Sequence, residues 1–406
     1  MKFLLIHQIF LSPKEGGGTR HFELARFAVQ KGHHASVVAS DVSYLDGKPI
    51  LTESEPEIIK GVEIYHARTL NTINRSFTLR AIAFISFMVT AVFKGLKVRD
   101  VDIVMGTSPP LLQGISAWMI ADLRRKPFLM EIRDLWPDFA IDMGVLKNPV
   151  LIWIARRIEV FLYRRADHLL VNSPAYRTYL LEQRGIASEK VTVIANGVDP
   201  SMFDPEEKGL EFRSELGLED KFVIAYTGAI GPANDLVTIT RAAERLRDRK
   251  DLCFLIVGDG KDRPQIEKIV AEQKLENIRM VGLRPKSEMP SILAAADACL
   301  ATLKNIPMFK TTYPNKIFDY MAAGRPIVLG IDGVIREVVE KANAGIFVCP
   351  GDDQKLAEAV VKLADDRASA KEMGHNGREY VSKHFNRACQ SDEFVKLLEN
   401  LIQNPA

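Results

Sequence analysis

The feature that most constrains the fold is a regular alternation of short apolar runs with amphipathic segments. In the first half, runs such as "KFLLIHQIF" and "VDIVMGTS" alternate with helix-like segments such as "TRHFELARFAVQKGHH". Runs that are apolar on both faces are typical of parallel strands covered by helices. The alternation begins again after "ANGVDPSMFDPEEKG", whose Asn-Gly and Pro residues predict a turn-rich connection. The sequence therefore predicts an α/β protein with two doubly wound domains.

Length and composition agree with this prediction and exclude several classes of protein. A chain of 406 residues exceeds the usual size of one core. Its 54 basic and 52 acidic residues give a net charge of +2, so nothing in the overall charge indicates nucleic acid. The four cysteines lie far apart without C-x-x-C spacing, which argues against a zinc site and favours a reducing cytoplasm. The opening "MKFLLIHQIF" is interpreted as a first strand because no signal-peptide cleavage site follows it.

One region departs from the even charge balance. Residues 75–165 contain 14 Lys and Arg against 8 Asp and Glu, which favours an anionic partner, although scattered solvated charges would give the same count. Within it, residues 81–93 form an uncharged run that is too short for a membrane span of about twenty residues. Basic residues flank this run (Arg75, Arg80, Lys94, Lys97 and Arg99). Two interpretations stay open: a buried core helix, or a helix in the interface of an anionic membrane.

Glycine-rich turns follow several of the predicted strands. In the first half, Gly16, Gly17 and Gly18 precede a helix with Thr19 as a plausible N-cap, so backbone N–H groups could receive a phosphate. The spacing matches neither G-x-G-x-x-G nor a P-loop, which weakens NAD and ATP as ligands. A purely structural role for these glycines is the alternative.

Two turns of the second half have the same character. Gly228 and Gly231 bracket the end of one strand in "YTGAIGPAND". In "VGDGKDR", Gly258 and Gly260 precede a helix that begins near Arg263. The Arg263 side chain could meet an anion there, or could simply be solvated.

The stretch "YPNKIFDYMAAGRPIV" is the most informative motif. Pro314 and Asn315 open a helix, and Pro suits the first turn, where a missing N–H costs nothing. Lys316 near a helix N-terminus is electrostatically unfavourable unless an anion lies beside it. Asp319, on the same helix face, could accept hydrogen bonds from a ribose diol. A bound nucleoside diphosphate explains both residues; a helical Lys316–Asp319 ion pair is the simpler alternative.

Taken in order, the glycine loop, "ANGVDPSMF", "VGDGKDR" and "YPNKIFDYMAAGRPIV" resemble the GT-B glycosyltransferases of family 4. "HQIFLSPKEGGGTRHFELA", "GTSPPLL" and "EIRDLWPD" resemble the subset that makes bacterial surface polysaccharides, including proposed N-acetyl-L-fucosamine transferases. The resemblance implies two Rossmann-like domains facing a central cleft. The N-terminal, acceptor-side domain would cover residues 1–200 plus 386–406, and the C-terminal, nucleotide-sugar-binding domain residues 201–385.

The family's activity is retaining, metal-independent sugar transfer, so the resemblance implies no metal and no cofactor beyond a nucleotide sugar, with UDP as the expected nucleotide. Asp319 matches the second acid of the family's E-x7-E motif, the ribose ligand, whereas Thr311 replaces the first. The Arg and Lys that hold the diphosphate in many members are replaced here by Ala229 and, roughly, by a residue of 233–235. Lys316 and Arg263 become the candidates to meet the diphosphate charge. Gly17, Gly18, Gly228, Gly260, Thr311, Pro314 and Asn315 complete the expected nucleotide-sugar site.

On the acceptor side, Arg133 and Asp134 follow a predicted strand where family members carry a His-Asp or similar pair. With Lys316 they are the candidate catalytic residues. Asp134 could take the proton of the attacking hydroxyl. Two alternatives remain: Arg133 and Asp134 form a structural pair, or the donor phosphate takes the proton. Asp100-Val101-Asp102 has the Asp-x-Asp pattern of a metal site in another glycosyltransferase architecture, but it precedes a buried strand, so we expect a turn.

The expected function is extension of a lipid-linked saccharide, as in O-antigen or capsule synthesis, by a cytoplasmic protein held peripherally at the inner face of the cell membrane. A sugar-nucleotide 2-epimerase of the same fold is one alternative, although the predicted cleft has few of the acids and histidines that epimerisation needs. A non-catalytic sugar-binding protein is the other.

Overall fold

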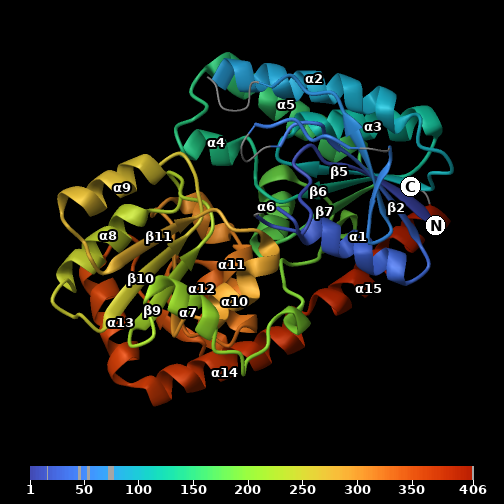
Figure 1. Cartoon of the computed structure of the whole chain (residues 1–406). Helices are drawn as coiled ribbons and strands as arrows, with labels where there is room; N and C mark the ends of the chain where they lie inside the picture. The colour runs from blue at the N-terminus through green and yellow to red at the C-terminus, as the bar shows by residue number, and fades with distance from the viewer. Residues whose placement is uncertain (16, 44–46, 53–54, 72–76, 405–406) are drawn as a thin grey trace. The chain divides into compact units, whose positions relative to one another are not determined.

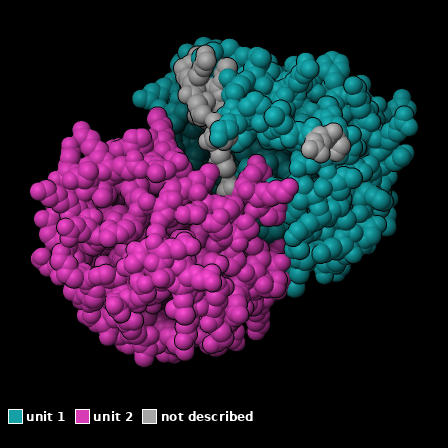
Figure 2. All heavy atoms as spheres, in the orientation of Figure 1, with its two compact units in different colours: residues 1–12, 19–195, 388–406 teal, residues 13–18, 196–387 magenta. Residues whose placement is uncertain are grey.

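The computed structural model describes residues 1–15, 17–43, 47–52, 55–71 and 77–404, leaving aside the side chains of residues 77, 78 and 80. Gly16 and Arg75, and the Arg80 side chain, thus lie outside the described part. The chain forms two compact units, coloured separately in Figure 2. Unit 1 comprises Met1–Ser12, Thr19–Ala195 and Ala388–Ala406, and unit 2 comprises Pro13–Gly18 and Asn196–Arg387. These boundaries lie within a few residues of the expected ones, except that the glycine loop Pro13–Gly18 belongs to unit 2.

Unit 1 is built on an eight-stranded sheet with the order β3-β4-β2-β1-β5-β6-β7-β8, labelled in part in Figure 1. All neighbouring strands are parallel except β3 and β4. The strands are β1 (Lys2–Ile6), β2 (His34–Ser40), β3 (Glu57–Ile59), β4 (Val62–Ala67), β5 (Ile103–Ser108), β6 (Phe128–Ile132), β7 (His168–Val171) and β8 (Val191–Val193). Each apolar run predicted in the first half forms one of these strands, and their near-complete burial explains why they are apolar on both faces.

Helices of unit 1 lie between these strands. They are α1 (Arg20–Gln30), α2 (Phe77–Gly95), α3 (Leu112–Arg124), α4 (Asp138–Asp142), α5 (Pro149–Arg165), α6 (Pro174–Arg184), the 3-10 helix η1 (Ser188–Lys190) and the C-terminal α15 (Arg387–Gln403). The start of α5 shows how sequence sets a boundary: Asn148 accepts a hydrogen bond from the Val150 N–H (2.9 Å), and Pro149 occupies the first helical position. The last helix, α15, packs on unit 1, where the Phe394 ring meets the Phe3 ring edge-on with centroids 5.8 Å apart.

Unit 2 contains a six-stranded parallel sheet with the order β11-β10-β9-β12-β13-β14. Its strands are β9 (Phe222–Thr227), β10 (Leu252–Val257), β11 (Ile278–Gly282), β12 (Ala298–Thr302), β13 (Ile327–Gly330) and β14 (Gly345–Phe347). Its helices are η2 (Pro200–Met202), α7 (Leu210–Leu216), α8 (Leu236–Arg245), α9 (Arg263–Glu272), η3 (Lys286–Glu288), α10 (Met289–Ala294), η4 (Pro307–Thr311), α11 (Asn315–Ala322), α12 (Val334–Lys341), α13 (Asp353–Asp365) and α14 (Arg367–His384).

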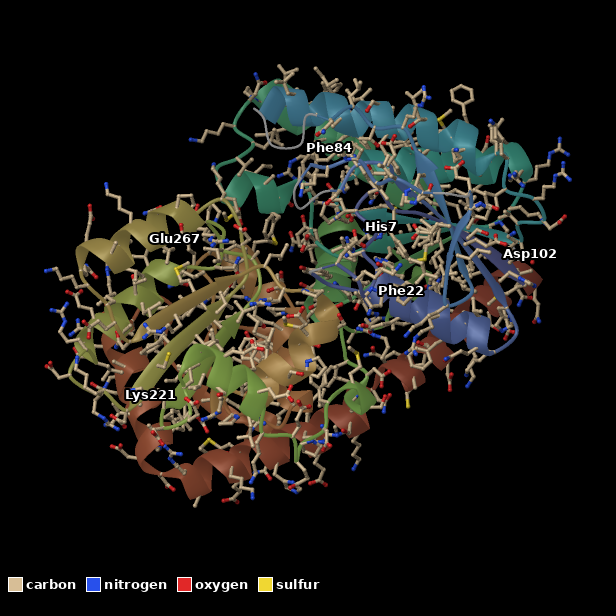
Figure 3. The ribbon with its side chains drawn as sticks, viewed as in Figure 1. His7, Phe22, Phe84, Asp102, Lys221 and Glu267 are labelled. Carbon is tan, nitrogen blue, oxygen red and sulfur yellow. The ribbon has the colours of Figure 1, made fainter. Side chains whose placement is uncertain are left out.

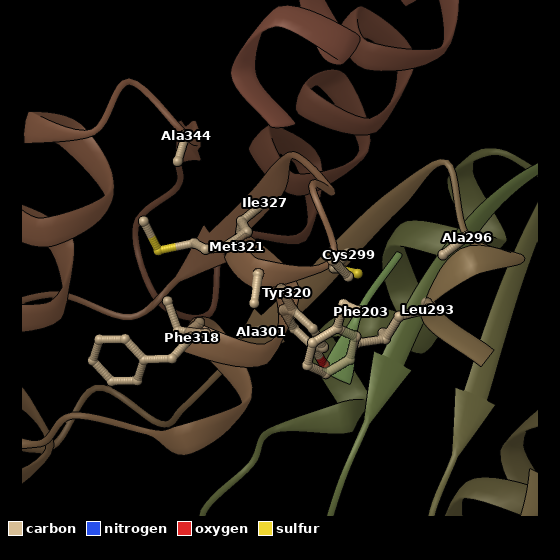
Figure 4. Close-up of a cluster of buried hydrophobic side chains, with 14 of the residues drawn as sticks. Phe203, Leu293, Ala296, Cys299, Ala301, Phe318, Tyr320, Met321, Ile327 and Ala344 are labelled. Atoms are coloured by element: carbon tan, nitrogen blue, oxygen red, sulfur yellow. The ribbon is translucent and has the colours of Figure 1, made fainter. Parts of the chain in front are cut away.

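Helix α11, which carries the "YPNKIFDYMAAG" motif, is fixed by the core of unit 2. Figure 4 shows Phe318, Tyr320 and Met321 packed in a cluster with Cys299 of β12. The Tyr320 hydroxyl also accepts a hydrogen bond from the backbone N–H of Thr227 at the end of β9 (2.8 Å). The polar residues of α11 are therefore held at a set distance from the turn that follows β9.

No helix in the described part of the chain combines the length and apolarity needed to cross a membrane.

Candidate active site

The turns after β9 and β10 are in direct backbone contact because they contain glycine. A Cβ on Gly258 would lie 1.8 Å from the carbonyl oxygen of Gly228, and φ of Gly258 is +151°. A Cβ on Gly260 would meet the carbonyl oxygen of Ile230 at 2.5 Å. Gly228 also lies against the Lys316 side chain, because a Cβ added at Gly228 would be 3.1 Å from Nζ of Lys316. The glycines thus bring two strand ends together beside the start of α11.

Lys316 is a half-buried cation without a carboxylate partner in the described chain. Its Nζ lies 4.0 Å from the centroid of the Tyr226 ring and 3.4 Å from Oδ1 of Asn234. A ring face and an amide compensate a buried charge only in part. Burial accordingly lowers the pKa of Lys316 to about 7. An anion beside this ammonium would restore the charged form.

Asp319 is paired with a lysine that the sequence did not reveal. Nζ of Lys286 lies 2.5 Å from Oδ2 of Asp319, and the two side chains are only 10% and 17% exposed. The simpler interpretation, a Lys316–Asp319 ion pair, is therefore wrong. The backbone N–H of Lys286 donates to the carbonyl of Glu15 (3.0 Å), which ties the glycine loop to the same place.

The glycine loop meets α11 at Gly18 and Asn315. A Cβ on Gly18 would lie 3.1 Å from Nδ2 of Asn315, so the loop backbone passes close to the helix start. Gly17, with φ of +127°, precedes this contact. Oδ1 of Asn315 is buried without a hydrogen-bond partner among the described residues. Pro314 occupies the N-cap position just before α11, one residue earlier than expected.

Two other predicted residues have protein partners in this structure. The Arg263 guanidinium contacts Asp259 (3.0 Å) and Glu267 (2.7 Å), so it would have to leave these carboxylates to meet a phosphate. Thr311 ends the η4 turn, and its hydroxyl donates to the carbonyl of Met308 (2.6 Å). Their roles toward a nucleotide sugar stay predictions.

In unit 1, a buried polar cluster lies at the carboxyl ends of β1, β5 and β6. Glu131 is fully buried and accepts hydrogen bonds from Nε of Arg20 (3.0 Å) and the Thr107 hydroxyl (3.0 Å), and it also pairs with His21. Burial alone would raise the pKa of Glu131, but His21 and Arg20 hold it well below its usual range. Glu131 thus stays ionised and compensates the buried Arg20.

Next to this cluster, Arg133 and His7 contact each other. Nη2 of Arg133 lies 3.3 Å from Nε2 of His7, and because a guanidinium only donates, His7 accepts there and carries its proton on Nδ1. Burial, assisted by His21 and Arg133, lowers the pKa of His7 well below 6.5, so His7 is neutral at pH 7. Figure 3 labels His7.

Four buried polar atoms at this edge lack hydrogen-bond partners among the described residues. They are two donors and two acceptors: Nδ1 of His7, Nε of Arg133, Oε1 of Gln8 and Oδ1 of Asn172. Each belongs to a residue that follows the carboxyl end of β1, β6 or β7, which lie close together in the sheet. Buried polar atoms are normally paired, so this concentration indicates a site for a ligand with both hydroxyl donors and acceptors.

Asp134 directly follows Arg133 in the sequence. Burial raises the pKa of Asp134 to about 6, although the charge of Arg133 acts in the opposite direction. A carboxylate with this pKa is mostly ionised at pH 7 and is basic enough to take a proton from a reacting hydroxyl.

The Asp-x-Asp triplet lies at the opposite end of the sheet, as Figure 3 shows for Asp102. Oδ2 of Asp102 accepts a hydrogen bond from the backbone N–H of Lys2 at the start of β1 (2.7 Å), and Asp100 has φ of +55°. The triplet is the predicted turn.

Sequence reasoning missed several residues of both groups. Gln8 and Asn172 follow predicted strands directly, so the rule that ligands bind at strand ends could have found them. Tyr226 and Asn234 flank the predicted glycine turn. Lys286, by contrast, begins the short 3-10 helix η3, whose sequence has no recognisable pattern.

Comparison with known proteins identifies the family and the fold. Residues 15–202 match the family model "Glycosyltransferase Family 4", and residues 221–366 match "Glycosyl transferases group 1". The fold matches HepE (Alr3699) of Anabaena, solved in complex with UDP-glucose, with a TM-score of 0.74, 18% identity, and coverage of 99% of this chain and 100% of that one. By its two family matches and by its fold, this chain belongs to the GT-B glycosyltransferases of family 4 and group 1.

Curated relatives differ in how much of their length this chain matches. The 2-deoxystreptamine glucosyltransferase of Streptomyces kanamyceticus is 28% identical over 56% of this chain, and the match spans 59% of that protein. WcaI of Escherichia coli K12, a proposed colanic acid biosynthesis glycosyl transferase, is 24% identical over 97% of this chain and 98% of its own length.

Proposed function

We propose that this protein is a retaining, metal-independent glycosyltransferase that moves a sugar from a UDP-linked donor to a lipid-linked saccharide at the inner face of the bacterial cell membrane. The acceptor chemistry is that of surface polysaccharides such as O-antigen or capsule, and an N-acetylated deoxy-sugar such as N-acetyl-L-fucosamine is the candidate for the transferred group. The observation that carries the proposal is Lys316, a half-buried ammonium beside Gly228 with no carboxylate partner in the described residues.

A diphosphate beside Lys316 fits this environment. Opposite unit charges about 4 Å apart gain roughly 4 kcal/mol at an effective dielectric near 20. The Gly228 turn lets a phosphate approach the backbone, since no side chain stands there. Asp319 would accept hydrogen bonds from the ribose while it stays in contact with Lys286. Lysine charge near the diphosphate would serve where other enzymes use a divalent cation.

The comparisons favour UDP and a polysaccharide over other choices. HepE, which shares this fold, was solved with UDP-glucose, and WcaI is named for colanic acid biosynthesis. The ligand of HepE and the name of WcaI describe those two proteins, and they support the proposal because this chain is similar to both.

The unit 1 cluster suits the acceptor saccharide. The unpartnered donors of His7 and Arg133 and acceptors of Gln8 and Asn172 would be satisfied by sugar hydroxyl groups. In the reaction, the acceptor hydroxyl oxygen bonds to the anomeric carbon, and the bond from that carbon to the phosphate oxygen breaks. UDP leaves with the bonding electrons. The hydroxyl proton passes to Asp134, whose raised pKa suits it as acceptor.

Transfer of label from radioactive UDP-sugars to polyprenyl-diphosphate saccharides tests this proposal. We expect one UDP-sugar to label the organic-solvent phase, with the anomeric configuration retained in the product. Asp134→Asn should reduce kcat by about 10²-fold or more with little change in the donor KM, because a general base typically contributes that much. In the parent, kcat should rise with pH through about 6 as Asp134 ionises.

Two results would contradict the proposal. Conversion of a UDP-sugar in the absence of acceptor would indicate an epimerase. Failure of every UDP-sugar to label any acceptor would contradict the proposed transferase activity. Full activity of Asp134→Asn would remove only the role of this carboxylate and assign the proton to the donor phosphate.

A further inference from the structure

Helix α2 is apolar on two opposite faces. One face packs into unit 1, where Ala83, Phe87 and Ala91 are fully buried at four-residue spacing. On the other face Ile82, Ile85, Val89 and Phe93 are 45%, 48%, 46% and 67% exposed. Residues spaced by three or four positions form one stripe along a helix. The core interpretation of residues 81–93 is therefore confirmed for one face of the helix, and the other face is an apolar stripe in contact with solvent.

Neighbouring helices extend this stripe. Helix α3 contacts α2, where the Ser116 hydroxyl donates to the carbonyl of Met88 (2.7 Å), and it contacts α5, where the Trp118 and Phe161 rings meet edge-on (4.7 Å). Figure 1 shows the three helices lying together in unit 1. Exposed apolar side chains continue across them: Leu96 after α2, Met119 and Leu123 on α3, and Val145, Val150, Leu151, Trp153 and Ile154 before and along the start of α5.

We call this set of side chains, with the α2 stripe, the α2–α3–α5 face. It holds 12 of the 17 large apolar side chains that are exposed in the described part of the chain, so the exposed apolar surface is concentrated there. A concentration of this size on a protein surface marks a binding face. The question is what covers it.

Charge around the face indicates an anionic partner. Between residues 81 and 166, nine basic side chains are exposed against three acidic ones. The basic residues are Lys97, Arg99, Arg125, Lys126, Lys147, Arg156, Arg157, Arg164 and Arg165, and the acidic ones are Asp100, Asp122 and Asp142. Most of the cations follow the ends of α2 and α3 or lie along α5 beyond its apolar start. A protein partner would need an apolar patch with an acidic rim to match, whereas an anionic lipid surface offers both properties everywhere.

An aromatic residue lies where the apolar and basic parts meet. Trp153 is 59% exposed, and the Arg157 guanidinium lies over its ring, 5.3 Å from the centroid. A tryptophan ring beside a cation is suited to the head-group layer of a bilayer, where the ring is buried and the charge meets phosphate.

We propose that the α2–α3–α5 face docks on an anionic phospholipid surface, with its apolar side chains in the interface and its basic side chains on the head groups. This docking rests on the proposed function in one respect: a lipid-linked acceptor would be reached at such a surface. Its physical evidence, the stripe and its basic surroundings, is independent of the nucleotide site.

Vesicle flotation with the full-length protein tests the docking. We expect the protein to float with vesicles of phosphatidylglycerol and phosphatidylethanolamine, at least ten-fold more than with phosphatidylcholine vesicles, and to be released in part by 0.5 M salt. The triple variant Ile85→Ser, Phe93→Ser, Trp153→Ser should lose at least ten-fold of the binding. The matched control replaces exposed apolar residues of unit 2, Leu210→Ser with Leu283→Ser, and should float like the parent.

A charge series separates the two contributions. Lys97→Glu with Arg125→Glu and Lys126→Glu should remove the preference for phosphatidylglycerol, whereas Lys371→Glu, an exposed lysine of unit 2, should not. Lys94 is left unchanged because it is paired with Glu55 (2.7 Å), and Arg156 because it is paired with Asp138 (2.6 Å).

Calorimetric UDP binding by the same proteins keeps this inference separate from the proposed function. UDP binding by a parent protein that does not float would overturn the docking and leave the proposed function standing. Flotation of a parent protein that does not bind UDP would support the docking and contradict the proposed function. A triple variant that floats normally but changes from dimer to monomer in light scattering would also overturn the docking, because the face would then join two copies of this chain.

Discussion

Lys316→Met is expected to abolish UDP binding while stabilising the ligand-free protein. The ammonium is placed for a diphosphate, and loss of a charge contact of roughly 4 kcal/mol corresponds to about a 10³-fold weaker Kd. Without ligand, the same ammonium is half-buried with only Asn234 and the Tyr226 ring to compensate it. Methionine fills a similar volume without the cost of desolvating a charge.

The pH dependence of stability distinguishes this explanation from a simple packing effect. Burial lowers the pKa of Lys316 from 10.5 to about 7, so between these values the unfolded chain binds more protons than the folded one. The contribution of Lys316 to stability is therefore unfavourable below pH 7 and diminishes as pH rises toward 10.5. Lys316→Met should raise Tm over the parent at pH 6.5 and lose that advantage by pH 9.5.

Thermal melts at several pH values and UDP calorimetry measure both effects, with Lys371→Met as the control at an exposed lysine. A Lys316→Met protein that binds UDP within three-fold of the parent, or that melts lower at pH 6.5, would contradict the assignment.

Glu131→Gln should strongly destabilise unit 1. Glu131 and the Arg20 side chain are 0% and 2% exposed, and the Gln variant would remove the carboxylate charge that the buried guanidinium contacts at 3.0 Å. Arg20 is held in place by the carbonyl groups of Ile194 and Ala195 (2.7 Å each), so it is not free to turn toward solvent. Breaking a buried pair by removing one partner costs about 3–5 kcal/mol.

Urea unfolding of the parent, Glu131→Gln and the exposed control Glu182→Gln measures this cost. Because the chain has two units, we expect only the transition of unit 1 to move. An equal midpoint for Glu131→Gln and the parent would show that the cluster carries little of the stability of unit 1.

Much of the fold was predictable from sequence because parallel strands buried on both faces leave a clear apolar pattern. The runs "KFLLIHQIF" and "VDIVMGTS" contain β1 and β5, and the alternation that begins again in the second half forms β9 to β14. The hairpin of β3 and β4 was not predicted. In the structure, Lys60 and Gly61 form its turn with φ of +49° and +83°, as a tight hairpin turn requires. Its strands are short and only partly buried, so their apolar pattern is weak.

The candidate site was predictable where a residue type conflicts with its position. Lys316 near a helix start is such a case, and the structure places it at the strand-end turn of Gly228. Lys286 could not be predicted, because its pairing with Asp319 depends on a fold that brings residues 33 positions apart together. For α2, the hydrophobic pattern alone could not separate core from surface, because the helix is apolar on both faces.

Calorimetric titration of UDP into the parent protein, Asp319→Ala and Asp319→Asn tests the central claim most directly, which is that the start of α11 holds a nucleoside diphosphate. Asp248→Ala, at an exposed aspartate of unit 2, is the matched control. We predict that the parent and the control bind UDP, and that both Asp319 variants bind about ten-fold to a hundred-fold more weakly, as expected for losing a hydrogen bond to a charged group. No UDP binding by the folded parent, or parent-like binding by both Asp319 variants, would contradict the account.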